Sequence, residues 1–426
     1  MGCKSFCLSL PIITLACCSA AHAKESITAP TLNEQFLNAI QLRDGGDLFQ
    51  AINILERLLS TSPRLNRARL ELAVAYYRAA LFEDAQKAAE TVLNAPDTPE
   101  QVKDTIQLFL TEVAASKKAA QQNRHSTSGI LAAGLGHDDN VNVGPNSSFI
   151  DIGGVQLELS PDAAPQSDLF GIMSAQLNHT YRMPGSFSFG GEPVQGLWQS
   201  LFSLYRKQYE TENDFHVDVI SIGTGPAFLS QSNWWAKLDL QADYIRLGDD
   251  TLGIYTTVSP SYSFIKNNNE ITLKASWLHR EFSGNSNEGM DGNRFGLGVE
   301  LMHPINNRWA TQLSADIYNQ DARDESESYD SYELAAGLYW QGWEDGTLYT
   351  KATHARSDYS GDEILFARSR DEHENSIELG VNHDFRAGEW TNWGLNAQIV
   401  YTENHSNIDL YDYDRTVLLI QATRQF

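Results

Sequence analysis

The strongest constraint on the fold is a two-residue alternation of apolar and polar side chains that runs through the last 301 residues. In the segment 236–244 every second residue is apolar, and the residues between them, such as Asp239 and Gln241, are polar or charged. Alternation of this kind predicts strands with one apolar and one polar face. Fourteen such runs are separated by clusters of Gly, Asn, Asp and Ser. The predicted strands cover residues 126–136, 168–182, 196–209, 215–229, 234–247, 253–266, 270–282, 292–304, 308–321, 329–341, 347–359, 374–386, 391–403 and 412–426.

A soluble β-sandwich also alternates, so three further features are needed to choose a membrane barrel. Aromatic residues gather at the ends of the apolar faces, where Tyr and Trp would meet the two membrane interfaces. The opposite faces carry charged and amide side chains that suit a wet lumen. The chain ends in Phe426, within a last strand that resembles the one recognised by the bacterial barrel-assembly machinery. In the alternation of that strand, Arg424 falls at a position whose side chain points outward. These features predict a 14-stranded antiparallel outer-membrane β-barrel over residues 126–426.

The predicted connections alternate between short and long. Short links at 267–269 and 305–307 are expected on the periplasmic side, and longer acidic links at 137–167, 283–291, 322–328 and 360–373 on the outside. Pro226 and Pro260 fall inside two predicted strands, where each removes a hydrogen-bond donor. Either these positions are bulges or the strand boundaries there are wrong.

The first 23 residues have the pattern of a secretory signal peptide. Lys4 precedes an apolar run from Phe6 to Cys18, and Ala21-His22-Ala23 suits cleavage after Ala23. Lipidation at Cys17 is an alternative. All four cysteines lie in this segment, so the mature chain would contain no disulfide and no cysteine metal site.

Residues 24–125 differ sharply from the rest in composition. They carry a net charge of −1 and none of the nine tryptophans, whereas residues 126–426 carry −24. Apolar and small residues recur at helical spacing in two copies, 32–97, about 34 residues apart, and a third amphipathic helix is expected over 99–119. This resembles the tetratricopeptide repeat (TPR) and predicts a periplasmic helical domain. The acidic total of −24 excludes a nucleic-acid binder.

In the tetratricopeptide family the first helix of each repeat lines a concave groove. A groove of this kind would suit an extended or acidic client peptide. In the alternative interpretation, Leu70 and Val74 belong to the core and the arginines are solvated. The candidate groove residues are Phe36, Ile40 and Arg43 in the first copy and Arg67, Leu70, Val74, Tyr77 and Arg78 in the second.

Two segments make the resemblance to a known family more specific. Two segments are similar to the surface lipoprotein assembly modulator (Slam) family. One is Arg67-Ala68-Arg69-Leu70-Glu71-Leu72-Ala73. The other is 128–142, which contains Gly134-Leu135-Gly136-His137-Asp138-Asp139-Asn140-Val141-Asn142. His137 stands where the family pattern has tyrosine, and Asp139 where it has serine. The resemblance implies a periplasmic TPR region joined to a 14-stranded barrel in the bacterial outer membrane.

The resemblance also implies a function, type XI secretion: moving a lipidated or soluble client protein to the cell surface. The expected partners are that client, the barrel-assembly machinery and outer-membrane lipid, and the protein is expected to be a monomer without a cofactor. Because no phosphate-binding loop occurs, transport would have to be downhill. Two alternatives remain open: a solute channel with a periplasmic docking domain, and a surface-binding protein anchored by its barrel.

No catalytic motif stands out, so an enzyme is not expected. The histidines at 279, 303, 354, 373 and 383 have nearby carboxylates, but such residues in barrel loops are usually solvated surface. Asp138-Asp139-Asn140 with Asn142 could hold calcium through oxygen ligands, yet the spacing lacks the glycine and glutamate of an EF-hand. An Asx-rich turn at a strand end is the favoured interpretation.

Overall fold

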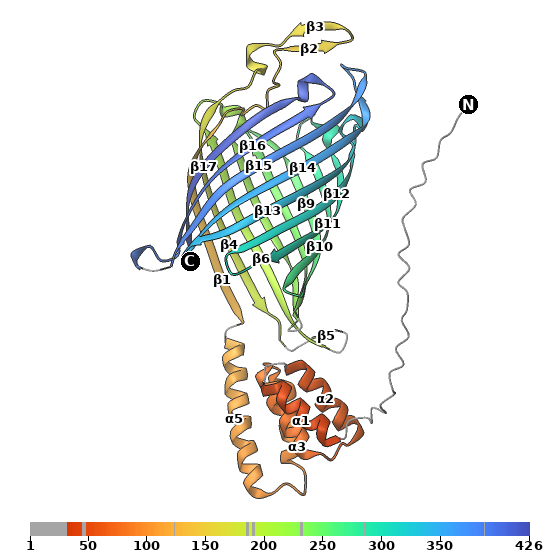
Figure 1. Cartoon of the computed structure of the whole chain (residues 1–426), viewed down its shortest axis with the longest axis vertical. Helices are drawn as coiled ribbons and strands as arrows, with labels where there is room; N and C mark the ends of the chain where they lie inside the picture. Colours follow the sequence, from red (N-terminus) through yellow and green to blue (C-terminus); the bar gives the residue numbers. More distant parts are fainter. Residues whose placement is uncertain are drawn as a thin grey trace, which may run out of the picture.

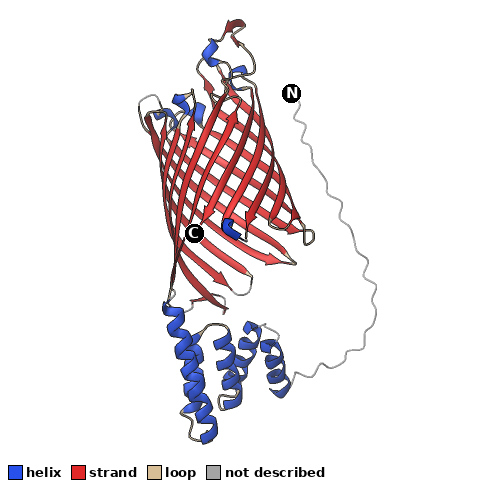
Figure 2. Ribbon diagram, turned by 90° about the vertical axis from the view of Figure 1, so that its left-hand side faces the viewer, coloured by secondary structure: helices blue, strands red, loops and turns tan. Residues whose placement is uncertain are grey.

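A computed structural model shows a helical region at one end of a β-barrel (Figures 1 and 2). The structure describes residues 32–44, 48–122, 124–184, 187–189, 192–230, 233–284, 287–386 and 388–426. The predicted signal peptide therefore lies outside the described residues. We call the barrel end beside the helices the proximal rim and the opposite end the distal rim.

Five α-helices occupy the described part of the chain before residue 123, and their starts follow a fixed period. α1, α3 and α5 begin at residues 32, 66 and 100, and α2 and α4 begin at 48 and 82, so equivalent helices start 34 residues apart. Each helix packs against the next along the chain. The 34-residue spacing predicted from the sequence is confirmed. The helices are α1 Leu32–Asp44, α2 Leu48–Thr61, α3 Asn66–Arg78, α4 Phe82–Leu93 and α5 Glu100–Gln122.

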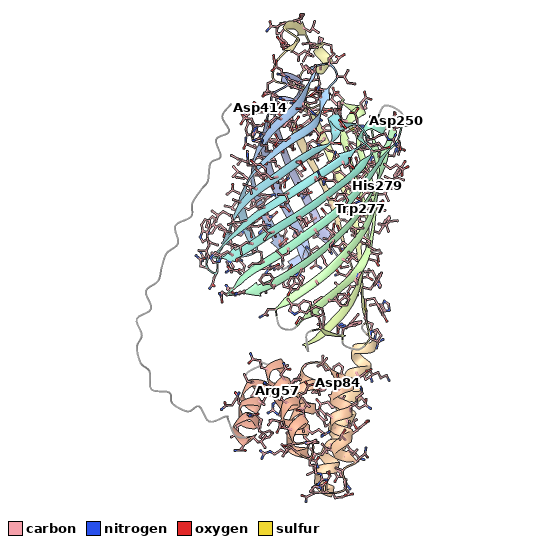
Figure 3. All side chains as sticks on the ribbon, turned by 90° about the vertical axis from the view of Figure 1, so that its right-hand side faces the viewer. Arg57, Asp84, Asp250, Trp277, His279 and Asp414 are labelled. Carbon is pink, nitrogen blue, oxygen red and sulfur yellow. The ribbon has the colours of Figure 1, made fainter. Side chains whose placement is uncertain are left out.

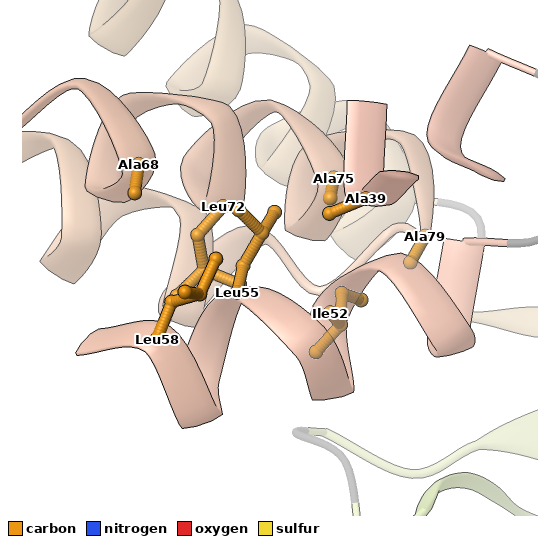
Figure 4. Close-up of a cluster of buried hydrophobic side chains, with 8 residues drawn as sticks. All are labelled: Ala39, Ile52, Leu55, Leu58, Ala68, Leu72, Ala75 and Ala79. Carbon is orange, nitrogen blue, oxygen red and sulfur yellow. The ribbon is translucent and has the colours of Figure 1, made fainter. Parts of the chain in front are cut away.

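The helical core is built from small residues at the crossings and leucines between them. Ala39, Ala68 and Ala75 lie against Leu55 and Leu72, all of them buried (Figure 4). Alanine at a crossing lets two helix backbones approach closely, and the leucines fill the space beside it. No helix of the described residues is long and apolar enough to span a membrane.

Replacing Leu55 by alanine should destabilise the helical region by about 2–5 kcal/mol, because the side chain is fully buried and leaves a cavity. The measurement is hydrogen exchange of the α2 and α3 amides, which should lose protection while the barrel strands keep theirs. Leu108→Ala is the matched control, since Leu108 is 72% exposed on α5. Equal protection in the two variants would contradict the packing described above.

The described strands form a closed ring of fourteen antiparallel strands. β1 pairs with β17 on one side and with β4 on the other, and β4 pairs with β6. From β6 to β17 each ring strand pairs with the next along the chain, so the ring is closed. The predicted fold class is thus confirmed. The ring strands are β1 His125–Asp138, β4 Asp168–Arg182, β6 Glu192–Tyr209, β7 Val217–Ser230, β8 Trp234–Leu247, β9 Asp250–Lys266, β10 Asn269–Phe282, β11 Gly292–Pro304, β12 Trp309–Ala322, β13 Tyr329–Trp343, β14 Gly346–Glu363, β15 Arg368–Phe385, β16 Trp393–Ser406 and β17 Tyr413–Gln425.

Three short strands lie outside this ring. β2 (Phe149–Ile152) and β3 (Val155–Glu158) form a hairpin in the long link after β1, beyond the distal rim in Figure 1. β5 (Phe187–Phe189) pairs with the beginning of β6. The hairpin adds structure to a link that the sequence predicts only as long and acidic.

The outer surface of the barrel is apolar, because the apolar residues of each alternating strand point outward. Leu297, Ile317 and Leu334 are 61%, 58% and 49% exposed, on three adjacent strands. Apolar side chains exposed all round a closed barrel are what a lipid-facing wall requires. On β10, Trp277 and His279 share the outward face near one another and both hydrogen-bond Asn293, at 3.1 Å (Figure 3).

One predicted loop is wrong. The link predicted over 360–373 shrinks to four residues, because β14 continues to Glu363 and β15 starts at Arg368. The pairing register shifts between Asp358 and Asp362, and the ladder then resumes with Asp362 opposite Ser369 and Glu363 opposite Arg368. The sequence did not indicate a strand here because the segment is rich in charged residues, and these become buried only through contacts with other hairpins.

Pro226 and Pro260 both lie inside strands, so the predicted boundaries there are right. The β7–β8 ladder skips Gly225 and Pro226, and the β9–β10 ladder skips the residues around Pro260, yet neither register shifts. A Cβ on Gly225 would lie 1.7 Å from the Leu238 carbonyl oxygen. Glycine at this position therefore permits the close approach of the β7 and β8 backbones.

Candidate functional site in the barrel lumen

The inward faces of four adjacent strands form an acidic wall. Between the levels of Arg370 and Glu378 on β15, cross-strand pairing places five carboxylates and two cations on the lumen side of β12 to β15, among the residues the structure describes. A fourteen-stranded ring is wider than the eight-stranded barrels that side chains fill, so this wall borders a lumen and not a packed core, while Arg370 itself is buried. The residues of this acidic wall are Asp316, Glu333, Glu372, Glu374 and Glu378, with Lys351 and Arg370.

Hydroxyl and amide groups order part of this wall. The Tyr349 hydroxyl donates to Glu378 at 2.7 Å, and the Tyr339 hydroxyl donates to Gln312 at 2.7 Å. On the neighbouring strands β8 to β12, serine, threonine and glycine surround a cavity of about 350 Å³, whose charged lining is two lysines and two aspartates, Lys237, Lys274, Asp239 and Asp316. Small hydroxylated side chains leave room and supply hydrogen bonds to a polar solute.

A buried ionic cluster ties the first and last strands together near the distal rim. Asp138 is fully buried and accepts two hydrogen bonds from Arg415, at 2.9 and 2.5 Å. The Tyr209 hydroxyl donates to the same carboxylate at 2.7 Å, and Lys207 lies 3.3 Å away. The Lys207 ammonium also sits 4.1 Å from the centre of the Phe170 ring. Both oxygens of Asp138 are therefore hydrogen-bonded to protein donors, while Arg415 keeps about a quarter of its side chain exposed.

The next residues clamp the long link over the distal mouth. Asp139 accepts from the Thr416 amide at 2.6 Å, and the Asn140 amide donates to Asp138 at 3.3 Å, which confirms the predicted Asx turn. The Asn140 side chain is 1% exposed and bonds both the amide and the carbonyl of Gly144, at 2.7 and 2.9 Å. It donates as well to the Asp414 carbonyl at 2.9 Å.

This clamp forces a strained backbone at Val143. Its φ is +50°, in the left-handed region that β-branched residues rarely adopt, at a cost on the order of 1–3 kcal/mol. Val143 then lies against a cavity of about 260 Å³ between β14, β15, β16 and the start of β17. We call this space the distal cavity. The strain is sustained because Asn140 holds the peptide on both sides of Gly144.

A buried arginine organises one side of the distal cavity. Arg370 is 8% exposed and its guanidinium lies 3.8 Å from the Tyr359 ring centre and 4.3 Å from that of Tyr411. It pairs with Glu327 at 3.3 Å and with Glu363 at 3.1 Å. Burial and nearby carboxylates raise the pKa of Tyr411 to about 12, so its hydroxyl stays a donor, to Glu363 at 3.1 Å.

Replacing Asn140 by alanine should release the link from the distal mouth. The change leaves the buried amide and carbonyl of Gly144 and the Asp414 carbonyl without this partner, at a cost of about 1–3 kcal/mol. Protease cleavage within 143–167 should become faster. Asn146→Ala is the control, because Asn146 bonds the same strand from an exposed position. Identical cleavage rates in the two variants would overturn the clamp.

The candidate groove residues of the helical region divide into three groups. Arg43 pairs with Glu71 and Asp44, and Arg78 pairs with Asp44 at 3.3 Å. The exposed Arg67 lies over the Phe36 ring at 5.2 Å and has no ion-pair partner in the described ranges. The structure thus brings the two helices α1 and α3 together through their arginines.

The other candidates are largely engaged by α4 and α5. Leu70 packs against the buried cluster of Ala89, Val92 and Ile106. The Tyr77 hydroxyl donates to Glu112 of α5 at 2.9 Å, and its ring contacts Phe109 at 5.5 Å. Ile40 and Val74 are partly buried. Burial and the Glu56 carboxylate raise the pKa of the neighbouring Tyr76.

Sequence reasoning missed the residues around the distal cavity. Arg370, Glu327 and Glu363 stood in a segment predicted as loop or at its edge, and only the folded barrel joins them. The histidines that stand near carboxylates in the sequence lie on the outward faces of their strands: His354 bonds Asn375 at 2.9 Å and stacks on His373. Within the described part of the chain, no three side chains of His, Cys, Asp or Glu are placed to hold a metal ion.

Comparison with known families gives one match. A model described as a protein of unknown function, DUF2860, matches residues 257–422. These residues include the acidic wall and most of the distal cavity. No curated protein matches the chain. Neither this description nor the structures below name the Slam family that segments of the sequence resemble.

The similar solved structures include outer-membrane proteins at low identity. An outer membrane channel from Pseudomonas putida F1 is 10% identical, covering 71% of this chain and 98% of its own, with a TM-score of 0.38. OccAB4 from Acinetobacter baumannii is 9% identical, covering 71% and 99%, with a TM-score of 0.33. OccK1 (OpdK) from Pseudomonas aeruginosa is 9% identical, covering 70% and 98%, with a TM-score of 0.35.

Proposed function

We propose that this protein is a passive outer-membrane channel that favours small, positively charged polar solutes. The observation that carries the proposal is the acidic wall, where five carboxylates face the lumen against two cations. Like charges on one side of a pore concentrate counter-ions and repel ions of their own sign. The apolar outside of the ring and the polar cavity on its inner wall support a membrane channel for polar solutes. No step of this function calls for a catalytic residue or a cofactor.

The test is uptake by liposomes that contain the purified protein. We expect faster swelling with small amines than with organic acids of the same size, and slower swelling with both as solute size increases. Swelling that is no faster than in protein-free liposomes would exclude the channel. Equal rates for amines and acids would exclude the preference for cations.

A second proposal is export of a client protein, with the helical region recruiting the client in the periplasm. What supports it is the position of the five helices at the proximal mouth, where α5 leads directly into β1 (Figure 1). A second support is Arg67, an exposed cation beside the Phe36 ring that an acidic, apolar segment could contact.

Deleting the gene separates the two functions. If the chain exports a client, a lipoprotein or secreted protein encoded beside it should disappear from the cell surface and collect in the periplasm. Complementation with Arg67→Glu should restore amine uptake but not that display. Unchanged display of every such protein after deletion would exclude the export function.

A further inference from the structure

We propose that the distal cavity is a binding site for a guanidinium or ammonium group of a small solute. This inference rests on the proposed channel function and names the chemical class of solute that the channel selects. The cavity is lined by side chains of four strands and closed on one side by Val143, with a volume of about 260 Å³. That is the space of about nine liquid water molecules, enough for one small organic cation.

The charges around the cavity do not balance. Arg370 is the one cation in its lining among the described residues, and Glu327 and Glu363 already neutralise it at 3.3 and 3.1 Å. Glu372 is a third carboxylate paired with the same guanidinium, at 3.6 Å, which is farther than a hydrogen bond reaches. Within the described ranges Glu374 makes no ion pair and accepts a hydrogen bond from the Tyr413 hydroxyl. One guanidinium thus faces three carboxylates, and Glu374 remains for a charge that the solute would bring.

The cavity lining contains more hydrogen-bond acceptors than donors, although the buried Nε of Arg370 also lacks a hydrogen-bond partner. Asn404 is 4% exposed, and its side-chain nitrogen is used by the Tyr411 carbonyl at 2.7 Å. Its side-chain oxygen has no partner among the described residues and lines the cavity. The Tyr413 hydroxyl already donates to Glu374 at 3.0 Å. This oxygen is not one of the buried unpartnered atoms of the described residues, so it is open to the cavity and can accept a hydrogen bond from a solute.

The aromatic rings favour a cation over a neutral donor. Tyr411 and Tyr413 line the same cavity as the free acceptor. Tyr411 already holds one guanidinium at 4.3 Å from its ring centre, that of Arg370. Planar guanidinium groups stack on such rings and bond carboxylates with two parallel hydrogen bonds. Carboxylates, a free amide oxygen and tyrosine rings together match a guanidinium or ammonium head.

The experiment is calorimetric titration of the full-length protein in detergent with agmatine, which carries both a guanidinium and an ammonium group. Glu374→Gln should weaken agmatine binding at least tenfold. Asn404→Asp should strengthen binding, because it adds a carboxylate where the free oxygen lies. Glu403→Gln is the matched control on the outward face of β16, and should bind like the wild type. Heat-modifiable gel mobility verifies that each variant is folded.

The site is overturned if the wild type does not bind agmatine, or if Glu374→Gln and Asn404→Asp both bind it as the wild type does. This outcome is distinct from failure of the channel. A cation-selective conductance without agmatine binding removes the site alone, whereas agmatine binding without conductance removes the proposed function and leaves the site.

Discussion

Replacing Asp138 by alanine should cost the barrel about 3–5 kcal/mol of stability, the largest single effect we expect. The carboxylate is fully buried, and removing it leaves Arg415 and Lys207 as unpaired cations beside one another. The Tyr209 hydroxyl also loses its acceptor. The measurement is equilibrium unfolding in urea from lipid vesicles, followed by tryptophan fluorescence.

Two comparisons show whether the loss comes from the unpaired charges. Asp139→Ala removes a neighbouring carboxylate that accepts one backbone amide, so it should cost only about 1 kcal/mol. Adding Arg415→Leu to Asp138→Ala should restore part of the stability, because one stranded cation is removed. A loss for Asp138→Ala no larger than for Asp139→Ala would contradict the role of the cluster.

Neutralising the acidic wall should remove most of the preference for cations. The variant Asp316→Asn with Glu333→Gln and Glu378→Gln keeps hydrogen-bonding side chains but removes three of the five carboxylates, and it spares the distal cavity. We expect the zero-current potential under a KCl gradient to fall by about half or more, since the field in the lumen is set by these groups.

The control neutralises carboxylates on the outward faces of neighbouring strands: Asp330→Asn, Asp358→Asn and Glu403→Gln. These changes alter the net charge of the protein equally but leave the lumen wall unchanged. They should leave the potential as in the wild type. An equal fall in both triple variants would mean that total charge, and not the wall, sets selectivity.

The strands were predictable from the sequence because the environment repeats at every second residue. Lipid on one side and water on the other constrain each strand in the same way, so Asp168–Arg182, Trp234–Leu247 and Gly292–Pro304 end where the alternation ends. The 34-residue helical period was visible for a similar reason: small residues return at each crossing. Both signals are local in the chain.

Neither the distal cavity nor the Asp138 cluster was predictable, because their contacts are distant in the chain. Asp138 and Arg415 are 277 residues apart, and Arg370 and Glu327 are 43 apart. In the sequence, the segment around Arg370 is a run of alternating charges, which is typical of a solvated loop. Only closure of the ring buries these charges together, and only then does Asn140 meet the carbonyl of Asp414.

The most direct test of the channel is the zero-current potential of the wild-type protein in a planar bilayer under a KCl gradient. A conductive lumen walled by Glu333, Glu374 and their neighbours should pass K⁺ more readily than Cl⁻, giving a potential of the sign that K⁺ selectivity sets. A correctly folded protein that conducts no current, or one that prefers Cl⁻, would contradict it.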